Sequence, residues 1–436
     1  MHDAHADTGP ADGAATADVI RQALDGHPAQ RGDLEDLYKD LHRNPELSFA
    51  EVRTSGIVAE RLRDLGYEVT TGVGRTGVVG VLANGEGPRV FLRADFDALP
   101  VAERTGLPYA STATAADQDG HQVPVMHACG HDMHVTCLLG ALRLLADARA
   151  SWSGTVVALF QPAEEIGKGA QAMVDDRLFA RFGTPDVVLG QHVGPFPAGA
   201  LGAHPGPALA ATDALRVQLF GKGGHGSRPE TAIDPVLMAA HTVVRLQSVV
   251  SREIAGGDTA VVTVGSMRAG TKDNIIPDDA ELKLNIRTYT DEVRGTVLAA
   301  VERIVKAEAA ASGAPREPEI SPIGRFPVLV NDPDATGRTV GALTAHFGPE
   351  AVFDPGPATG SEDCGTFATA SGAPLCFWFF GGTDREQFAA ALEAGTVARD
   401  IPSNHSPLFA PVVQPTLDVG VAAMTVAALA WLAPAG

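Results

Sequence analysis

Apolar residues recur along this chain at two different spacings, which predict helices in some segments and strands in others. Spacings of three and four residues predict amphipathic helices over residues 34–41 and 52–65, and Gly66 supplies a stop for the second helix. Runs of consecutive apolar residues predict buried strands. These runs cover residues 155–160, 186–190 and 375–380. Because helical segments such as 137–145 alternate with them, we expect an α/β layered domain with a largely parallel sheet.

Two more strands are predicted over residues 77–82 and 89–93. The Asn84-Gly85 pair between them is typical of a hairpin turn, since both residue types tolerate the positive φ that a tight turn requires. We therefore expect these two strands to be neighbours in the sheet.

The pattern changes near residue 211, where apolar and polar residues begin to alternate. Alternation is typical of a strand with one face exposed to water. The predicted elements then follow the order β-α-β-β-α-β, which is that of a ferredoxin-like module. Its strands are predicted over residues 215–220, 260–267, 280–289 and 320–330, and its helices over 235–254 and 291–311. We predict an inserted domain over 211–320, within a discontinuous domain made of 33–210 and 321–436.

The two ends of the chain differ in character. Residues 1–32 are polar, and they lack the basic start and apolar run of a secretory signal, so we expect a polar N-terminal tail. Residues 419–434 are apolar but fall short of the roughly 18 residues that span a bilayer. We therefore expect a closing helix packed on the core, and a soluble, cytoplasmic protein.

Composition excludes several classes of function. The chain carries 33 basic and 53 acidic side chains, a net charge of −20, whereas binding to nucleic acid or to an anionic membrane requires clustered cations. Four cysteines in 436 residues are too few for a disulfide scaffold. Apolar residues make up 45% of the chain, which is ample material for a globular core.

The densest group of reactive side chains lies at residues 126–134, which hold three histidines, a cysteine and an aspartate. Cys129 and His131 flank a glycine, so both can reach one metal ion or a pair of ions. Thiolate and imidazole both suit zinc and related transition metals. The alternative is a histidine-rich surface loop.

Further candidates follow apolar strands directly or nearly so. Glu164 and Glu165 come just after one predicted strand, and His192 just after another. Functional groups in open α/β sheets gather at the carboxyl ends of strands. Adjacent carboxylates make sense if one binds a cation and the other takes a proton from water. The alternatives are a solvated acidic turn and a structural histidine. A fourth cluster of candidate residues lies far downstream at 403–407 and contains His405.

Eight short motifs extend these clusters along the chain. They are LRADFDALP at 92–100, HACGHD at 127–132, QPAEE at 161–165, GQH at 190–192, GGHGS at 223–227, NIIPD at 274–278, GSED at 360–363 and NHSP at 404–407. In this order they resemble the M20 metallopeptidase family, and within it the amidohydrolase branch of hippurate hydrolases, bacterial aminoacylases and plant auxin-conjugate hydrolases. The resemblance runs from about residue 34 to the C-terminus.

The resemblance implies a zinc-peptidase-like α/β/α catalytic domain interrupted by a ferredoxin-like lid that usually dimerises. It also implies two divalent metal ions per subunit, zinc or manganese with cobalt a further option. The implied metal ligands are Cys129, which would bridge the ions as a thiolate, with His131, Glu165, His192 and His405. Glu164 would be the general base, and Asp97 would orient a metal-bound imidazole. In the lid, His225 would stabilise the oxyanion, often across the dimer interface, while Asn274 and Arg287 would hold the substrate carboxylate.

The implied reaction is hydrolysis of the amide bond of an N-acyl or N-aroyl amino acid to a carboxylic acid and a free amino acid. Metal-activated water would attack the amide carbon, and Glu164 would pass its proton to the leaving amine. Three alternatives stay open: a dipeptidase or carboxypeptidase of the same family, a catalytically silent metal-binding protein, and a thiol enzyme with Cys129 as nucleophile. We expect a homodimer acting on small molecules, without nucleic-acid or membrane partners.

Overall fold

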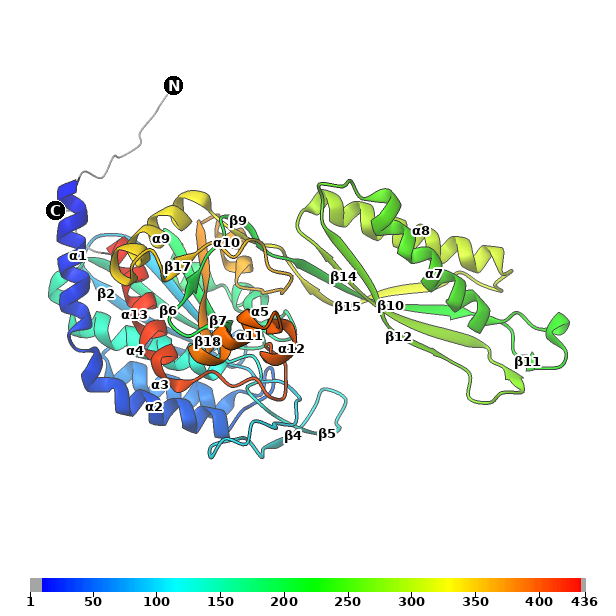
Figure 1. Cartoon of the computed structure of the whole chain (residues 1–436), viewed down its shortest axis with the longest axis horizontal. Coiled ribbons are helices and arrows are strands. Elements are labelled where there is room, and N and C mark those ends of the chain that lie inside the picture. The colour runs from blue at the N-terminus through cyan, green and yellow to red at the C-terminus, as the bar shows by residue number, and fades with distance from the viewer. Residues whose placement is uncertain (1–9, 433–436) are drawn as a thin grey trace, which may run out of the picture. The chain divides into compact units, whose positions relative to one another are not determined.

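The computed structural model describes residues 10–432 of the chain, which form two units (Figure 1). Unit 1 combines the chain up to residue 206 with 330–356 and the part from 363 onward. Unit 2 combines Pro207–Leu329 with Pro357–Glu362. The inserted stretch is therefore longer at both ends than the predicted 211–320.

The segment Pro357–Glu362, which we call the return segment, is an unpredicted part of unit 2. Ser361 Oγ donates a hydrogen bond to the carbonyl of Ala210 at 2.7 Å, and the guanidinium of Arg287 donates to the carbonyl of Thr359 at 2.6 Å. These bonds join the segment to the sheet of unit 2. Its six residues carry no apolar periodicity, so the pattern along the chain does not reveal this second crossing.

An eight-stranded mixed sheet forms the centre of unit 1, in the order β1-β2-β6-β3-β7-β18-β8-β17. Its strands are β1 (Glu68–Val73), β2 (Gly77–Asn84), β3 (Arg89–Asp95), β6 (Gly154–Gln161), β7 (Val187–Pro197), β8 (Leu201–Gly202), β17 (Val352–Phe353) and β18 (Leu375–Thr383). β6, β3, β7 and β18 run parallel to one another, whereas β1 and β2 pair antiparallel. The parallel strands bring their carboxyl ends to one edge of the sheet.

Helices cover both faces of this sheet. They are α1 (Pro10–Leu24), α2 (His27–Arg43), α3 (Val52–Asp64), α4 (His131–Asp147), α5 (Gly169–Asp175), α6 (Leu178–Phe182), α9 (Pro333–Phe347), α10 (Gly365–Ser371), α11 (Arg385–Glu393), α12 (Val397–Asp400) and α13 (Val413–Leu432). Val90 and Leu92 of β3 belong to the core that α4 and α13 cover, while Phe91 stacks on Phe179 of α6 on the opposite face. Unit 1 is thus an α/β/α layered domain, as predicted.

The prediction that the strands at residues 77–82 and 89–93 are neighbours in the sheet is wrong. β2 and β3 form there, but β6 lies between them, antiparallel to β2 and parallel to β3. β6 is buried along almost its whole length, and a central position gives hydrogen-bond partners to both of its edges. The hairpin partner of β2 is β1, on its other side.

Residues 10–32 do not form the predicted polar tail. They contain α1 and the beginning of α2, and Ile20 and Ala23 lie in the core beside α13. Apolar residues are sparse in this stretch, so a helical repeat is not obvious from the sequence. Residues 1–9 lie outside the described residues.

The closing helix is present as α13 and starts before the predicted position 419. By length and composition it is apolar enough to cross a membrane, but 72% of its most apolar window is buried inside the protein. It packs against α4 and α9, which makes it a core element of unit 1. The last two residues of the predicted span, 433–434, lie outside the described residues.

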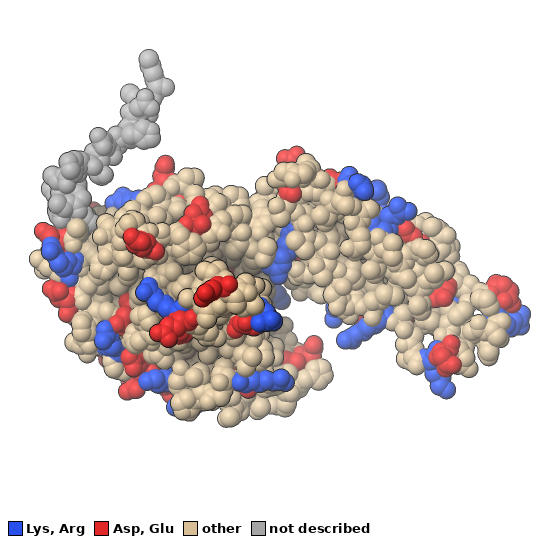
Figure 2. Space-filling model, in the orientation of Figure 1, with Lys and Arg blue, Asp and Glu red and all other residues tan. Residues whose placement is uncertain are grey.

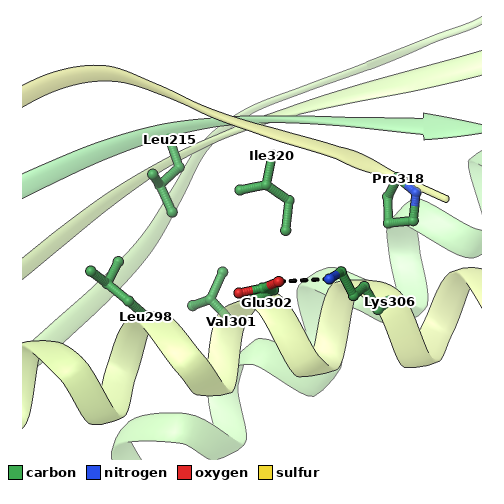
Figure 3. A pocket seen from close by; sticks show the side chains of 7 residues that line it. All are labelled: Leu215, Leu298, Val301, Glu302, Lys306, Pro318 and Ile320. Atoms are coloured by element: carbon green, nitrogen blue, oxygen red, sulfur yellow. Dashed lines mark hydrogen bonds and ion pairs between the residues drawn. The ribbon is translucent and has the colours of Figure 1, made fainter.

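Unit 2 contains a four-stranded antiparallel sheet in the order β12-β14-β10-β15, with α7 and α8 packed on one face. Its elements are β10 (Ala211–Phe220), β11 (Gly224–His225), α7 (Pro235–Glu253), β12 (Ala260–Ala269), β13 (Ile275–Ile276), β14 (Asp279–Thr288), α8 (Asp291–Ala311) and β15 (Glu319–Phe326). Without the short separate ribbon of β11 and β13, the order β10-α7-β12-β14-α8-β15 is that of a ferredoxin-like module. Leu298, Val301 and Ile320 line a groove of about 380 Å³ between α8 and β15, beside the Glu302–Lys306 ion pair (Figure 3).

Candidate metal centre

Parallel strands of unit 1 bring the predicted side chains to one edge of the sheet. The residues are Asp97 just after β3, Glu164 and Glu165 just after β6, and His192 within β7, which continues to Pro197. Cys129 and His131 reach the same edge at the start of α4. Gly130 between them has φ of 87°, and a Cβ there would lie 2.3 Å from Val193, so only glycine fits this turn.

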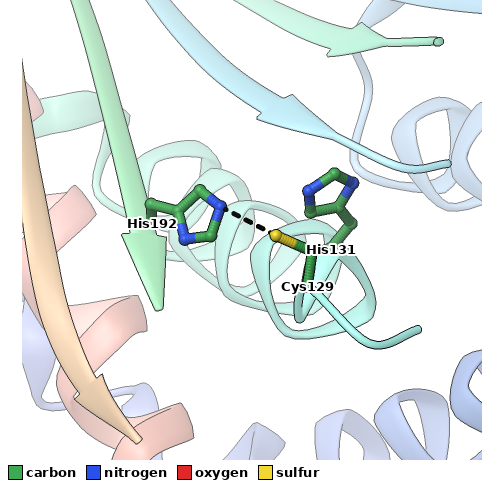
Figure 4. A group of neighbouring side chains, drawn as sticks. All are labelled: Cys129, His131 and His192. Carbon is green, nitrogen blue, oxygen red and sulfur yellow. Dashed lines mark hydrogen bonds between the residues drawn. The ribbon is translucent and has the colours of Figure 1, made fainter. Parts of the chain in front are cut away.

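Cys129 and His192 face each other, with His131 beside them (Figure 4). The Cys129 Sγ lies 3.5 Å from His192 Nε2. His192 Nδ1 lies 2.8 Å from the carbonyl oxygen of Val193, which can only accept, so the ring proton of neutral His192 is on Nδ1. Its Nε2 therefore presents a lone pair towards Cys129, as a metal ligand must.

His131 is fully buried and is oriented in the same way. Its Nδ1 lies 3.4 Å from Asp97 Oδ1, and its Nε2 lies 3.7 Å from Glu165 Oε1 and 4.0 Å from Glu164 Oε2. The carboxylate of Asp97 thus faces one ring nitrogen and leaves the other for the centre of the cluster.

His405 completes the predicted set from a distant part of the chain, with Nε2 3.3 Å from Glu165 Oε2. Its backbone is left-handed, with φ of 71°. The neighbouring Asn404 donates through Nδ2 to the carbonyl oxygens of Cys129 and Val193, both at 3.1 Å. Asn404 therefore ties this loop to both sides of the cluster, a role that the sequence did not suggest.

The ligand atoms form two groups that share Cys129, one with His131 and His192 and the other with Glu165 and His405. Within each group the atoms lie within 4.8 Å of one another. Within this cluster, both ring nitrogens of His131 and Oε1 of Glu165 are buried, and the described residues supply no hydrogen-bond partner to them. Buried polar atoms left in this way are costly, and a cation is the partner that suits both a lone pair and a carboxylate oxygen. The residues present fit a two-metal site with a shared thiolate.

Burial perturbs the protonation of these groups. Burial and the charge of Glu165 raise the pKa of the Cys129 thiol well above its usual value, and burial also raises the pKa of Glu165. Burial and the nearby His134 lower the pKa of His192, so this ring is neutral. Burial alone would lower the pKa of His131, but Asp95 and Asp97 outweigh it and raise that pKa well above its usual value. A coordinated cation favours deprotonated thiol and carboxyl groups and neutral imidazole, so metal binding would release protons from Cys129, Glu165 and His131.

In unit 2 the ribbon of β11 and β13 brings His225 beside Asn274, whose carbonyl accepts a hydrogen bond from Gly226 N at 2.8 Å. His225 Nδ1 accepts a hydrogen bond from Ser227 N at 3.1 Å and lies 2.8 Å from Ser227 Oγ. Because an amide N–H can only donate, the proton of neutral His225 is on Nε2. His225 therefore offers an N–H donor from an exposed position.

Arg287 lies at the other end of unit 2. Gly221, close before the ribbon, donates to the carbonyl of Asp278 at 2.7 Å, at the start of β14. Arg287 is eight positions along that strand from Asp279, about 26 Å at 3.3 Å per residue. Within one unit 2 the structure brings Asn274 together with His225, and it does not bring Arg287 near either of them.

The family model for peptidase family M20/M25/M40 matches residues 91–398. The hippurate hydrolase of Campylobacter jejuni is 39% identical over 340 residues, which cover 77% of this chain and 85% of that protein. Thermostable carboxypeptidase 2 of Saccharolobus solfataricus is 37% identical over 79% of this chain and 84% of its own length. A dinuclear metal-binding M20 peptidase of Bacillus subtilis has a TM-score of 0.71 at 29% identity, covering 92% of this chain and 98% of its own.

The chain belongs to the M20 family. It is a hydrolase of the amidohydrolase type, as the resemblance of its motifs implies.

Two residues outside the proposed ligand set support β7 in this M20 protein: His134, from the group at 126–134, and Asp95, from the motif at 92–100. His134 Nδ1 lies 2.6 Å from Asp95 Oδ1, and His134 Nε2 accepts from Val193 N at 2.8 Å. The His134 ring lies 4.4 Å from that of His192, between centroids. His134 therefore fixes the backbone next to His192, from a position one helical turn after His131.

The first turn of α4, which carries His131, is anchored by a buried ion cluster. His42 Nδ1 lies 2.7 Å from Asp132 Oδ2, and its Nε2 lies 3.1 Å from Glu103 Oε1. Since both ring nitrogens face carboxylate oxygens, both must donate, and the ring is an imidazolium. Burial alone would lower the pKa of His42, but Asp132 and Glu103 outweigh it and raise the pKa to about 10.

Proposed function

We propose that this protein is a metal-dependent amidohydrolase that cleaves N-acyl or N-aroyl amino acids, with two divalent ions and Glu164 as general base. The observation that carries the proposal is the pair of ligand groups that share Cys129. A relative named hippurate hydrolase, which is 39% identical, supports the choice of an N-aroyl amino acid.

Cys129, His131, Glu165, His192 and His405 would hold the two ions. Thiolate and imidazole favour zinc, while the carboxylate also accommodates manganese or cobalt. When bound, such ions supply a water of lowered pKa and polarise the scissile carbonyl. The protein's own part is to set the lone pairs of His131 and His192 towards one point, as the contacts of their opposite ring nitrogens do.

Glu164 is 5% exposed, beside the cluster but outside both groups that share Cys129. As general base it would take the proton of the attacking water and deliver it to the leaving amine. Its backbone N–H donates to Asp97 Oδ1 at 3.0 Å, and that of Glu165 donates to Asp97 Oδ2 at 3.0 Å. A single carboxylate, that of Asp97, would thus position the base Glu164, the ligand Glu165 and the ring of His131.

His225 would stabilise the oxyanion through its Nε2–H. An N-acyl amino acid is far shorter than the span of β14, so one substrate cannot touch both His225 and Arg287 of the same unit 2. We propose that Arg287 binds the substrate carboxylate in one active site and that His225, with Asn274 beside it, completes the active site of a partner subunit.

The surface of unit 2 supplies a reason for such a dimer. β12 is one of the two edge strands of its sheet, and α7 packs next to it. Leu237 and Val244 on α7 are 58% and 72% exposed, and Val261 and Met267 on β12 are 40% and 43% exposed. An exposed apolar edge strand tends to pair with another chain. In a two-fold dimer the same edge of each subunit is buried against that of its partner. We propose a homodimer through α7 and β12.

Of the three alternatives, only the peptidase keeps a specific observation in its favour. The 37%-identical relative named carboxypeptidase keeps peptide substrates open. A thiol enzyme would also use Cys129, but a nucleophilic thiol needs a lowered pKa, whereas that of Cys129 is raised. A silent metal-binding protein would have lost the base, and Glu164 is in place.

We further propose that the protein works in the cytoplasm on small molecules. Its four cysteines are free thiols, which suits a reducing compartment. On the face shown in Figure 2, Lys and Arg side chains are interspersed with Asp and Glu. Mixed charge of this kind lacks the concentrated positive field that steers polyanions.

The test is a substrate panel on the apoprotein reloaded with zinc, manganese or cobalt in turn. N-benzoyl, N-acetyl and long-chain acyl amino acids are compared with dipeptides and longer peptides, with Glu164→Ala as the inactive control. We expect acyl amino acids to be cleaved and chelator to abolish the activity. Preferential release of C-terminal residues from peptides would favour the carboxypeptidase. Activity that survives chelator but not alkylation would favour the thiol enzyme.

A further inference from the structure

The turn after β6 has an unusual set of backbone partners. Three successive amides, those of Ala163, Glu164 and Glu165, all donate to buried carboxylates. The first bonds to Glu51 Oε1 at 2.9 Å, and the other two bond to the oxygens of Asp97 at 3.0 Å each. Successive N–H groups that point to one side form a concave anion-binding nest, and here two side chains of the protein fill it.

The turn needs this support because Ala163 has a left-handed backbone, with φ of 49°. That conformation is unfavourable for a residue with a Cβ, and it persists only where the surroundings impose it. Ala163 is fully buried, so its N–H has no access to water if Glu51 is removed. The side chains of Glu164 and Glu165 leave the backbone immediately after this residue.

Glu51 stands at the N-cap of α3 but does not cap it. Glu46 does so instead, with Oε1 accepting from Arg53 N at 2.9 Å and Oε2 from Thr54 N at 2.8 Å. The Glu51 carboxylate turns inward, where it is fully buried and also accepts from Phe49 N at 2.9 Å and Thr76 Oγ1 at 2.6 Å. Since Glu46 caps α3, the buried carboxylate of Glu51 must have another structural role.

We propose that Glu51 is a positioning residue for the metal centre, because its carboxylate holds Ala163 left-handed and thereby sets the direction of Glu164 and Glu165. The inference rests on the proposed roles of those two glutamates. It adds a fourth carboxylate, from the loop before α3, to those of Asp97, Glu164 and Glu165, although Glu51 itself touches neither substrate nor metal.

The test compares Glu51→Leu with Glu51→Gln. Leucine keeps the volume and removes the acceptor, whereas glutamine keeps an oxygen for Ala163 N and can donate to Thr76. Glu46→Ala is the matched control. It also removes a carboxylate that binds two backbone amides, but those amides belong to the first turn of α3 and not to the turn after β6. If Glu51→Leu does not fold, Glu51→Asp replaces it, because the shorter side chain withdraws from Ala163.

Two readouts do not depend on activity. Calorimetric titration of the apoproteins with zinc should show Glu51→Leu binding 10–100-fold more weakly, as is typical when a group supporting a metal ligand is lost. Hydrogen exchange of the apoprotein should speed up across residues 163–165. Glu51→Gln should restore most of the affinity, and Glu46→Ala should lower thermal stability without changing affinity. For an active enzyme, kcat should fall with affinity while KM changes little.

Wild-type zinc affinity and exchange rates in Glu51→Leu or Glu51→Asp would overturn the proposal, as would an equal loss of affinity in Glu46→Ala. A wild-type protein that binds zinc but cleaves no acyl amino acid would refute the proposed function alone. The exchange at residues 163–165 still decides the role of Glu51 in that case.

Discussion

Replacing His42 by glutamine should destabilise unit 1 in a way that depends on pH. His42 is held between Asp132 and Glu103, and these carboxylates raise its pKa from 6.5 to about 10. At about 1.4 kcal/mol per pH unit, the imidazolium contributes about 5 kcal/mol to the free energy of unfolding. Because the pKa is raised on folding, this contribution is complete below pH 6.5 and is lost as the pH rises to about 10.

Urea unfolding of the apoprotein between pH 6.5 and 10 measures this effect. All three tryptophans, Trp152, Trp378 and Trp431, belong to unit 1, so their fluorescence follows the unit that contains His42. The stability difference between wild type and His42→Gln should be smallest at pH 10 and should grow by up to about 1.4 kcal/mol for each pH unit below it, down to pH 6.5.

His346→Gln is the control, because burial lowers the pKa of His346 and its ring stays neutral throughout this range. Its difference from wild type should not change with pH. A His42→Gln difference that is constant, or that widens as the pH rises, would show that His42 is not an imidazolium bridging two carboxylates.

Four further predictions concern the metal centre and the dimer. Glu164→Ala should keep both ions but lower kcat at least about 100-fold, which metal analysis and initial rates would check; lost metal would make Glu164 a ligand. Burial raises the pKa of the Cys129 thiol, so zinc binding at neutral pH should release a proton from it. Calorimetry in buffers of different protonation enthalpy counts the protons released, and Cys129→Ser should release fewer than wild type. Val244→Glu should yield monomers by light scattering, whereas the equally exposed Val52→Glu in unit 1 should stay dimeric. Mixed dimers of His225→Ala with Glu164→Ala should be more active than either parent, and equal inactivity would refute a trans-acting His225.

Local pattern is enough to predict most elements of this protein, but not how its strands pair. The β-α-β-β-α-β order of unit 2 is visible in the sequence because each strand alternates in polarity. The position of β6 between β2 and β3 is decided by burial of a strand more than 70 residues away from β2 in the sequence. A turn such as Asn84-Gly85 reports only on its own backbone.

Several candidate ligands, such as Cys129 and Glu165, stand out in the sequence because they cluster at strand ends or carry distinctive chemistry, whereas the full ligand set, with His405, follows only from the resemblance of the motifs to the M20 family. The residues that position them are not distinctive. Glu51 reads as a solvated residue at a helix start, and only the fold shows that it bonds to Ala163, 112 positions away. His42 and Asn404 are similar, since their partners are decided by tertiary contacts.

The return segment has a consequence for dissecting the gene. A domain inserted once can be excised by joining the two flanking positions. Here the chain passes from unit 1 into unit 2 twice and returns to unit 1 each time. A fragment spanning 207–329 would lack Thr359 and Ser361. A unit 1 made by deleting that fragment would still contain the six residues of the return segment, which belong to unit 2. An independently expressed unit 2 therefore needs residues 357–362 grafted on through a linker. Exchanging unit 2 between relatives requires two coordinated exchanges rather than one.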